Sequence, residues 1–371
     1  MQAKALVKQH LLVTGQTGSG KTTAALTMIE ELKQNDQTVI ILDPTGEYSH
    51  QENMVVYKLG ENCYIDPGSL TAPQLLSIMD IEDDNLMKKV ANAITSLKIQ
   101  ANLHKDKTGV YIKNNRPIKE HNEAVNQLES WMRNYNYDLL SQQVIEEYVL
   151  PYGDERADYH LLGQVYDRQK INQAWDQILD LEAKNHADIF RQIFGTRNRK
   201  GQSKLEISYV LTLFTKMKAK KRALVIDISE LKKYPQSQKQ VLSLIMQVIL
   251  QLRMEQSKSF PITVFLDEAH RYLPNELRDL SENGMFQLLR EGRKYGLNLA
   301  LITQSPLDLP ASMLGQFSNF LIHHLATTTE EKSLQIPNLD SRKLATLGVG
   351  QAVVCLDNAF VGMWKGKENN F

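Results

Sequence analysis

The stretch "LLVTGQTGSGKTT", residues 11–23, decides the fold. It begins with a short apolar run, which predicts a buried β-strand, and continues into a turn that holds Gly15, Gly18 and Gly20. Glycine lets such a loop wrap tightly, so that its backbone N–H groups point inward, and we expect a helix from about Lys21. A strand, a glycine-rich loop and a helix in this order form a cradle for phosphate, because the positive end of the helix faces the anion.

The spacing of this loop fits the pattern G-x-x-x-x-G-K-[ST], which is typical of nucleoside triphosphate binding. In this pattern the Lys21 ammonium neutralises the β- and γ-phosphates, and the Thr22 hydroxyl holds Mg²⁺. The alternative is a glycine turn that matches by chance, and its position between a predicted strand and a predicted helix argues against that. We therefore expect ATP and Mg²⁺ as cofactors. The residues expected at the nucleotide are Gly15, Gln16, Thr17, Gly18, Ser19, Gly20, Lys21, Thr22 and Thr23.

Four further apolar runs predict strands, at 38–43, 223–227, 262–267 and 297–304. Their hydrophobicity is continuous rather than alternating, which indicates strands that are covered on both faces, as in a parallel α/β sheet. Each run ends in a polar residue, and the ligands of open α/β sheets bind beyond the carboxyl ends of the strands. Five separate segments are therefore expected to deliver side chains to one edge of the sheet.

The sequence changes character between about 73 and 204, where strand signals are absent and charged, helix-forming residues dominate. We expect one α/β domain over 1–371, with a helical insertion at about 73–204. Beyond Asn319 three more apolar runs follow, and little more than Asp357-Asn358 separates the last two. This short polar separation predicts a C-terminal β-hairpin.

Two carboxylates end the run at 262–267, in "ITVFLDEAHRYLP". Beside a phosphate loop such a pair predicts hydrolysis: Asp267 would contact Mg²⁺ through water, and Glu268 would orient and deprotonate the attacking water. The alternative is a helix N-cap with an acidic first turn. Gln304 ends the next run, where its amide could touch both the γ-phosphate and the water. Alternatively, it is a polar strand-end residue in the turn before Pro306.

A basic segment, "LLREGRKYG", precedes that last strand and supplies Arg290, Arg293 and Lys294. A guanidinium placed against the γ-phosphate of a neighbouring subunit would stabilise the charge of the transition state. We therefore expect Arg290 or Arg293 to act across an interface between subunits. The alternative is a solvated basic helix end, which the helix dipole favours.

Composition narrows the classes of partner and compartment. Lys plus Arg and Asp plus Glu number 43 each, so the formal net charge is zero and a nucleic acid would need a local basic surface. Cys63 and Cys355 match neither a metal-ligand spacing nor a disulfide framework, which favours a reducing compartment. His323 and His324 are expected to pack or to face solvent rather than to bind metal. The apolar stretches are too short to span a bilayer, and we expect a soluble cytoplasmic protein without membrane insertion.

Together these segments resemble the HerA family, in the HerA/FtsK branch of RecA-like P-loop ATPases. The resemblance lies in "VTGQTGSGKTT", "ILDPTGEY", "VFLDEAHRYLP", "REGRKYGLNLALITQSP" and "LGVGQAVV", which stand in the family's order and cover most of the α/β portion. The Asp-Glu-Ala-His box, followed at this spacing by Arg-Glu-Gly-Arg-Lys and Thr-Gln, is the specific part. The resemblance implies a RecA-like fold and adds Asp43 to the residues expected at the nucleotide.

The same resemblance implies a homohexameric ring that moves double-stranded DNA through its pore, often with a nuclease. Relatives work in antiphage defence beside nuclease or NAD-consuming effectors, and other kin drive DNA or protein through secretion channels. Family members usually carry a small β-barrel ahead of the ATPase. In this sequence the first strand is expected about ten residues in, so we expect no such barrel and a partner that is a separate polypeptide.

Two basic stretches are candidates for contact with DNA, because a translocating ring must follow the phosphate backbone with cations. They are "FGTRNRKGQSK" at 194–204 and "KMKAKKR" at 216–222. Neither interleaves aromatic residues, so stacking of single strands is not expected, and the alternative for both is an ordinary solvated loop. The residues predicted to contact DNA are Arg197, Arg199, Lys200, Lys216, Lys218 and Lys220, with Lys204 in the first stretch.

Three functions remain open at this stage. The first is a ring-shaped, ATP-driven translocase of double-stranded DNA. The second is an ATP-dependent switch or assembly scaffold that controls a partner enzyme without processive movement, and the third is a motor of the secretion or conjugation type. All three require hydrolysis of ATP, and stimulation of that hydrolysis by DNA separates the first from the second.

Overall fold

The computed structural model of the chain describes residues 3–256, 260–274, 277–337, 339 and 341–365. The chain divides into two compact units. The first combines Met1–Asn62 with Ile207–Phe371, and the second is Cys63–Glu206. The segment expected to be a helical insertion, 73–204, lies within the second unit. That the two units form a single domain stays a prediction.

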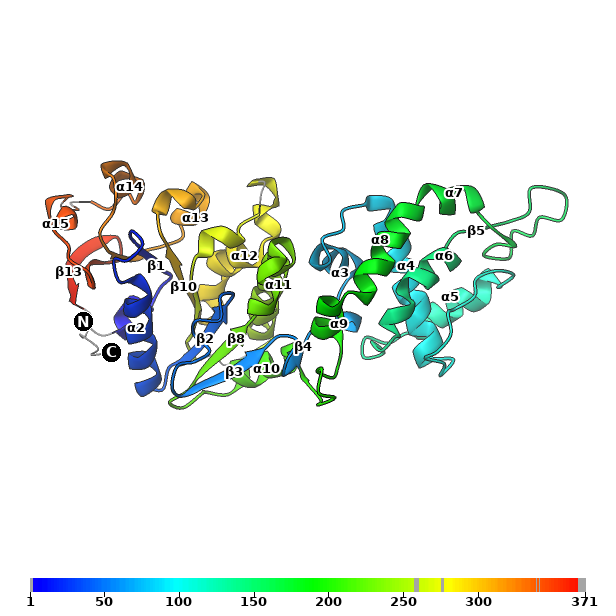
Figure 1. The fold of residues 1–371 in the computed structure, drawn as a ribbon, viewed down its shortest axis with the longest axis horizontal. Helices are drawn as coiled ribbons and strands as arrows, with labels where there is room; N and C mark the ends of the chain where they lie inside the picture. Colours follow the sequence, from blue (N-terminus) through cyan, green and yellow to red (C-terminus); the bar gives the residue numbers. More distant parts are fainter. Residues whose placement is uncertain (1–2, 257–259, 275–276, 338, 340, 366–371) are drawn as a thin grey trace. The chain divides into compact units, whose positions relative to one another are not determined.

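A nine-stranded sheet forms the centre of the first unit, in the order β13-β12-β11-β1-β10-β9-β2-β8-β3 (Figure 1). Every pairing from β11 through β3 is parallel, whereas β12 is antiparallel to both β11 and β13. The strands are β1 Leu11–Thr14, β2 Thr38–Asp43, β3 Met54–Lys58, β8 Ala223–Asp227, β9 Ile262–Leu266, β10 Leu297–Thr303, β11 Asn319–Ile322, β12 Gln351–Leu356 and β13 Ala359–Lys365. The predicted α/β fold with a mostly parallel sheet is confirmed.

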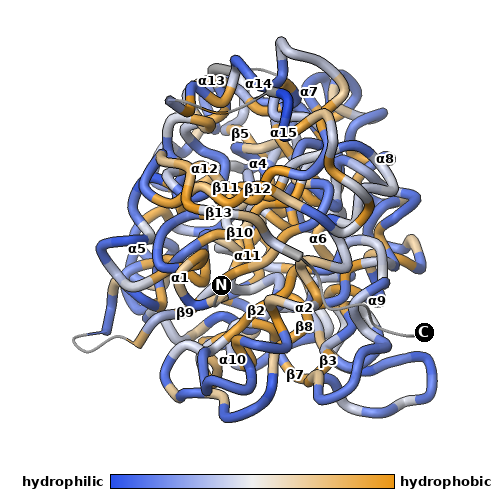
Figure 2. The backbone as a smooth tube through the Cα atoms, turned by 90° about the vertical axis from the view of Figure 1, so that its left-hand side faces the viewer, coloured by the Kyte–Doolittle hydropathy of each residue, from blue (hydrophilic) through white to orange (hydrophobic). Residues whose placement is uncertain are grey.

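The five apolar runs predicted as strands coincide with β1, β2, β8, β9 and β10, whose residues are all buried. Figure 2 shows β2, β8 and β10 in hydrophobic colours. The sequence analysis missed β3. This strand lies at the edge of the sheet and all five of its residues are only half-buried, so it lacks a continuous apolar signal.

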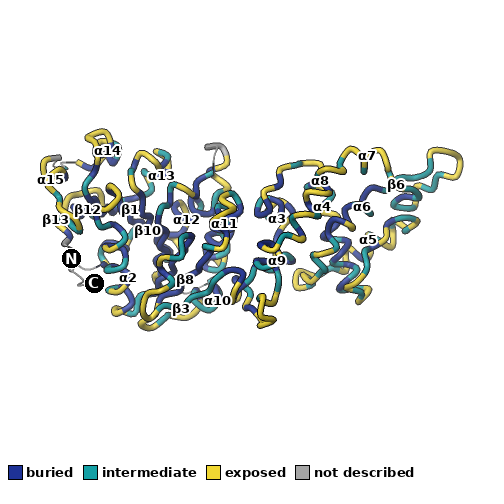
Figure 3. The backbone as a smooth tube through the Cα atoms, in the orientation of Figure 1, coloured by how far each residue is buried: buried dark blue, intermediate teal, exposed yellow. Residues whose placement is uncertain are grey.

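Helices cover both faces of this sheet, and Figure 3 shows its central strands in the colour of buried residues. On one face α1 Ala3–Leu6 and α2 Lys21–Gln34 share a hydrophobic core with residues from β1, β2, β10 and neighbouring strands. Alternate strand residues such as Leu12, Ile40 and Leu301 are also fully buried, and α12 (Gly284–Glu291) contacts β10. Further helices of this unit are α10 Ile207–Lys216, α11 Pro235–Met254, α12 Gly284–Glu291, α13 Ala311–Leu314, α14 Thr328–Ser333 and α15 Ser341–Ala345.

The predicted C-terminal hairpin is present, as β12 and β13 joined at Asp357 and Asn358. Both turn residues adopt positive φ, 50° and 62°. Two consecutive residues of this kind form the turn whose twist matches that of paired strands, and Asp and Asn tolerate this conformation better than most residues. The polar pair that indicated the hairpin in the sequence is therefore its turn.

The second unit is mainly helical. Its helices are α3 Ala72–Ile78, α4 Asp84–Asn102, α5 Ile118–Gln127, α6 Leu140–Glu146, α7 Arg168–Gln173, α8 Trp175–His186 and α9 Asp188–Phe194. Two strands that the sequence did not signal, Val149–Leu150 and Val165–Tyr166, pair here as β5 and β6. Strands of two residues are too short to leave an apolar pattern. A second short pair, β4 Cys63–Tyr64 and β7 Leu205–Glu206, joins the two ends of this unit.

Candidate functional site

The glycine-rich loop lies between β1 and α2, as its sequence predicted. Gly15, Gly18 and Gly20 have φ of 150°, 79° and 101°, which favour glycine. Space is also restricted at two of them. A Cβ at Gly15 would lie 2.5 Å from the Cβ of His323, and one at Gly20 would lie 2.8 Å from the backbone nitrogen of Gly350. The first and last of these glycines therefore allow close packing against the C-terminal part of the chain.

Backbone contacts from that part of the chain hold the loop in shape. The N–H of Gln16 donates to the carbonyl of His324 at 2.8 Å, and the N–H of Gly350 donates to the carbonyl of Ser19 at 3.0 Å. His323 is fully buried, and its Nδ1 lies 3.1 Å from the same Ser19 carbonyl. Burial lowers the pKa of His323 to about 4, so its ring is neutral near pH 7 and Nδ1 must carry the proton to donate to a carbonyl.

Lys21, at the start of α2, folds back over the loop. Its Nζ donates to the carbonyls of Gly15 at 2.7 Å and Gln16 at 3.0 Å. Burial lowers the pKa of Lys21, while the negative charges of Glu268 and Asp267 raise it. A phosphate is negatively charged, whereas the two carbonyls are neutral, so a phosphate would bind this ammonium more strongly and could displace them. The outer loop residues that remain exposed are Gln16, Thr17 and Gly18.

Asp267 follows β9 and meets the loop helix. One carboxylate oxygen, Oδ2, accepts from Thr22 Oγ1 at 3.3 Å and from the Tyr48 hydroxyl at 2.9 Å, while Oδ1 accepts from the N–H of Glu268 at 2.8 Å. Burial raises the pKa of Asp267, and these hydrogen bonds lower it. A hydroxyl and a carboxylate this close supply the hard oxygen donors that Mg²⁺ prefers, and water and phosphate oxygens would complete its shell.

Glu268 is held by residues that end β10. Its backbone has a φ of 51°, in the left-handed region that non-glycine residues seldom adopt. Gln304 Nε2 donates to both of its carboxylate oxygens, at 3.2 and 3.3 Å. His270 Nδ1 lies 3.5 Å from Glu268 Oε2 and 3.2 Å from Thr303 Oγ1. An uncommon backbone conformation held by surrounding contacts is typical of functional sites.

The structure therefore brings five predicted site residues together at the carboxyl ends of β1, β9 and β10. They come from three segments that lie far apart in the sequence, and side-chain contacts join Thr22 to Asp267 and Glu268 to Gln304. The charges of both carboxylates also act on the Lys21 ammonium. The arrangement can hold a triphosphate and a divalent cation and can present a carboxylate to water.

Asp43 ends β2 and has a different setting. It is fully buried, and its carboxylate accepts from the backbone N–H groups of Gly46 at 2.7 Å and Tyr48 at 2.8 Å. It therefore organises the loop at 44–49. That Asp43 contacts the nucleotide stays a prediction.

The two arginines lie away from this site within the subunit. Arg290 lies in the last turn of α12 and Arg293 follows this helix. Both are exposed, and both precede β10, whereas the site lies at the other end of that strand. Burial, and then the charge of Arg293, lower the pKa of His10 to about 4, and His10 directly precedes β1. The arginines thus occupy the amino edge of the sheet, and their action on a neighbouring subunit stays a prediction.

The two basic stretches lie in different units. In the second unit an isolated bridge between Arg197 and Ser203 closes a hairpin that exposes Arg197, Arg199 and Lys200. Lys204 differs, because it is buried and its ammonium donates to the carbonyl of Gln192. In the first unit the other stretch precedes β8. Its exposed cations are Lys216, Lys218, Lys220, Lys221 and Arg222.

Sequence reasoning missed the residues that support the site. Tyr48, His270 and Thr303 contact its carboxylates directly or through one another, and His323 and Gly350 hold the phosphate loop. Tyr48, His270 and Gly350 stand within motifs that the sequence had already indicated, so those motifs were the available signal. His323 lies more than 300 residues from the loop along the chain, and that separation gives no signal of their contact.

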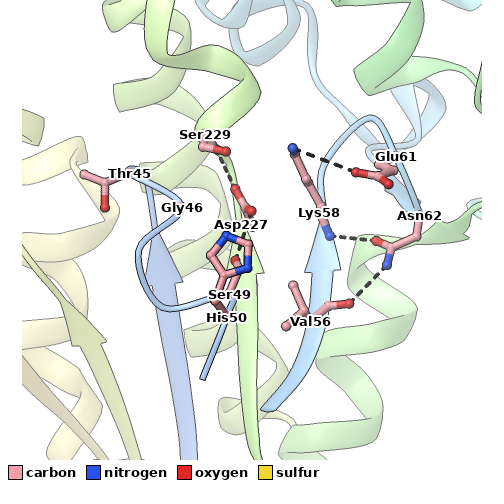
Figure 4. A pocket seen from close by; sticks show the side chains of 10 residues that line it. All are labelled: Thr45, Gly46, Ser49, His50, Val56, Lys58, Glu61, Asn62, Asp227 and Ser229. Atoms are coloured by element: carbon pink, nitrogen blue, oxygen red, sulfur yellow. Dashed lines mark hydrogen bonds and ion pairs between the residues drawn. The ribbon is translucent and has the colours of Figure 1, made fainter. Parts of the chain in front are cut away.

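A separate cavity of about 440 Å³ lies at the carboxyl ends of β2, β3 and β8 (Figure 4). Its walls are polar: Asp227 is 4% exposed and accepts from Ser49 Oγ at 3.0 Å, and Lys58 pairs with Glu230 at 2.8 Å. The loop at 44–50 forms one wall and also carries Tyr48. The lining residues are Thr45, Gly46, Ser49, His50, Val56, Lys58, Glu61, Asn62, Asp227 and Ser229.

Within the ranges that the structure describes, no group of three His, Cys, Asp or Glu residues is placed to hold a metal ion. A Mg²⁺ at the site would therefore depend on Thr22, Asp267, water and nucleotide oxygens. Over the same ranges, no helix is long and apolar enough to cross a bilayer.

Comparisons with known sequences place the chain beside helicases. The family model for the central domain of helicase HerA matches residues 1–252, and the model for the HerA-like helicase C-terminal region matches 193–362. A probable DNA double-strand break repair helicase HerA of Methanocaldococcus jannaschii is 24% identical, over 94% of this chain and 69% of its own length. The DNA double-strand break repair helicase HerA of Saccharolobus solfataricus is 21% identical, over 93% of this chain and 61% of its own length. The chain thus spans about two thirds of these relatives.

Solved structures share the fold. VirB4 of Thermoanaerobacter pseudethanolicus has a TM-score of 0.58 at 13% identity, over 97% of this chain and 90% of its own. The plasmid coupling protein TrwB in complex with ADP and Mg²⁺ has a TM-score of 0.55 at 13% identity, over 99% of this chain and 90% of its own. Identity this low shows likeness of the fold alone.

Proposed function

The chain belongs to the HerA helicase family, and from this premise we propose that it is a cytoplasmic, ATP-hydrolysing motor that moves double-stranded DNA as a homohexameric ring. The observation that supports hydrolysis best is the pair of contacts that join Thr22 to Asp267 and Glu268 to Gln304. In this proposal the contacts align a metal-binding pair and a general base at the carboxyl ends of β1, β9 and β10.

In the proposed mechanism the loop N–H groups and Lys21 bind the phosphates of ATP. Lys21 exchanges its contacts with the carbonyls of Gly15 and Gln16 for phosphate oxygens. Thr22 and Asp267 would hold Mg²⁺, which neutralises charge that develops between the β- and γ-phosphates. The TrwB structure with ADP and Mg²⁺ supports this choice of ligands for a protein of the same fold.

Glu268 orients the attacking water and accepts its proton. Gln304 donates both of its bonds to this carboxylate in the structure, so a γ-phosphate oxygen would compete for the same amide. The amide can therefore report whether the γ-phosphate is present. Arg290 or Arg293 of a neighbouring subunit supplies the remaining positive charge.

DNA is the proposed cargo because the curated relatives are named as DNA double-strand break repair helicases. The exposed cations Arg197, Arg199 and Lys200, or those of the stretch at 216–222, would contact its phosphates. The partner that uses the movement would be a separate nuclease or other effector, in DNA processing or antiphage defence.

The test is the ATPase rate as a function of duplex length, duplex sequence and salt, with any co-encoded partner present. A motor must pass every sequence, so stimulation should be indifferent to sequence, rise with length and fall steeply with salt. Displacement of streptavidin from a biotinylated duplex end reads the movement itself, and Lys21→Ala provides the inactive control.

If duplex DNA stimulates nothing under any of these conditions, the translocase is excluded. An ATP-dependent switch or scaffold for a partner enzyme is then the better account, and the zero net charge of the chain agrees with it. The likeness in fold to VirB4 and TrwB also keeps a motor of the secretion or conjugation type open.

A further inference from the structure

Tyr48 is a buried tyrosine whose hydroxyl meets the carboxylate proposed to serve Mg²⁺. The phenol donates to Asp267 Oδ2 at 2.9 Å, which is a shorter contact than the 3.3 Å from Thr22 Oγ1 to the same oxygen. These two residues come from different segments and share a single acceptor atom. Two donors on one oxygen leave the Asp267 carboxylate little freedom to rotate.

The backbone holds Tyr48 in this position from the other side. Its N–H donates to Asp43 Oδ2 at 2.8 Å, while Asp43 Oδ1 accepts from Gly46 at 2.7 Å, so one buried carboxylate fixes the whole turn. Tyr48 itself is 2% exposed and belongs to the hydrophobic core that α1 and α2 share with the sheet. The hydroxyl therefore cannot leave Asp267 without a movement of the loop at 44–49.

The phenol is the donor in this contact, because an ionised carboxylate oxygen can only accept. Unlike the Thr22 hydroxyl, whose oxygen a metal ion would take as a ligand, the Tyr48 hydroxyl needs no rearrangement when nucleotide binds. It is thus suited to fix the carboxylate both before and after the metal arrives.

We propose that Tyr48 is a positioning residue for the metal, which orients Asp267 toward the water shell of Mg²⁺ and acts through that carboxylate alone. It touches neither nucleotide nor metal in this assignment. The proposal rests on the proposed function, because it assumes that the site binds ATP with Mg²⁺. It assigns to the loop after β2 a part in metal binding that its sequence does not indicate.

The experiment compares Tyr48→Phe, which removes only the hydroxyl, with Tyr57→Phe on β3 as a matched control. The dissociation constant of a non-hydrolysed ATP analogue is measured with Mg²⁺ and with EDTA, and their ratio is the gain that the metal provides. Tyr48→Phe should reduce this gain about tenfold, the order of one hydrogen bond to a charged group. Affinity in EDTA should stay within about twofold, because the loop and Lys21 are unchanged.

A double-mutant cycle separates positioning from general support of the fold. In Asp267→Ala there is no carboxylate left to orient, so adding Tyr48→Phe should change the gain by less than about twofold. If the second substitution lowers the gain again by the full factor, Tyr48 acts by another route and the proposal fails. It also fails if Tyr48→Phe weakens the analogue equally with Mg²⁺ and with EDTA.

The wild-type protein distinguishes this proposal from the proposed function. If the wild type shows no gain from Mg²⁺, the site does not bind the metal nucleotide and the proposed function falls together with the role of Tyr48. If the wild type shows the gain and Tyr48→Phe retains it, only the role of Tyr48 is overturned. Thermal melts of each variant without nucleotide show whether a loss reflects unfolding.

Discussion

The carboxyl edge of the sheet and the basic hairpin at 197–203 show two ways of holding polar side chains. At the sheet edge Asp267 and Glu268 each accept hydrogen bonds from residues of other segments. In the hairpin the exposed side chain of Arg197 donates to the carbonyl of Gly201 at 3.4 Å, which is a long contact within its own loop. Chemistry needs groups that are placed in advance, whereas a moving polymer needs cations that can exchange partners. In the proposed motor, the sheet edge would perform the hydrolysis and the hairpin would contact the DNA.

The largest expected effect tests whether the ATPase site needs an arginine from a neighbouring subunit. Arg290 and Arg293 lie at the amino edge, so Arg290→Ala or Arg293→Ala should lower turnover about 10³-fold or more if that residue acts on a neighbour. ATP binding should change little, because the loop and Lys21 belong to the other subunit. The measurement is steady-state ATPase against protein concentration, with nucleotide binding measured in parallel.

Mixing experiments provide the control for this prediction. An arginine variant and Glu268→Gln should restore activity together, because one mixed interface carries both intact residues. A strictly monomeric particle whose specific activity is independent of concentration would contradict an arginine supplied across an interface.

The second prediction tests the preorganised carboxylate itself. Glu268→Gln preserves the shape of the side chain but removes its basicity, so turnover should fall at least about 10²-fold while ATP still binds. Lys21→Ala is the contrasting variant, since it should lose nucleotide binding as well. Near-normal turnover of Glu268→Gln would remove Glu268 from the role of general base.

The third prediction concerns the histidine that supports the phosphate loop. The pKa of His323 is about 4 in the folded chain against about 6.5 when unfolded, so the unfolded state binds more protons between these values. The contribution of His323 to the free energy of unfolding should therefore be fully present above about pH 6.5. It should decline as the pH falls toward 4, by on the order of 1 to 3 kcal/mol.

Urea unfolding at a series of pH values measures this decline. His323→Gln should be less stable near pH 7 and should lose stability less steeply below pH 6.5. His104→Gln, at an exposed histidine of the second unit, is the control and should follow the wild type. His10 is buried with a similarly lowered pKa, so some of the decline should remain in His323→Gln. An unchanged slope in His323→Gln would show that its protonation is not coupled to folding.

The smallest effect is expected from the basic hairpin. Replacing Arg197, Arg199 and Lys200 by alanine should lower stimulation by duplex DNA several-fold at low salt and flatten the salt dependence, since each lost phosphate contact removes about 0.9 from the slope. The rate without DNA is the internal reference.

The same triple substitution at Lys216, Lys218 and Lys220 is the matched comparison. It tests the stretch before β8 in the first unit. If both triple variants keep the wild-type salt slope, neither stretch follows the DNA backbone. The hairpin would then not be the surface that contacts DNA, and its contrast with the sheet edge would have no functional meaning.

Much of this contrast could be predicted from the sequence, because the signals for buried parallel strands are local. Asp267 and Gln304 stand directly after apolar runs, and the rule that parallel strands present their carboxyl ends together was enough to bring them to one edge. The edge strand β3 was not predicted, because only one of its sides is paired and its residues are half-buried, so that it lacks a continuous apolar run. Tyr48 could not be assigned because its role depends on the distance of its hydroxyl to Asp267, which only the folded chain defines.

The contacts of Gly350 and His323 with the phosphate loop also bear on the order in which the protein is made. The loop occupies residues 15–22, near the start of the chain, yet residues beyond 320 hold it in shape. The central strand β1 likewise pairs only with β10 and β11, which follow it by almost 300 residues. A chain emerging from the ribosome would thus carry its nucleotide motif long before it could form the site, since contacts between distant segments close late. ATP binding should therefore appear only after the residues up to Gly350 have been made, so that shorter nascent chains do not consume nucleotide.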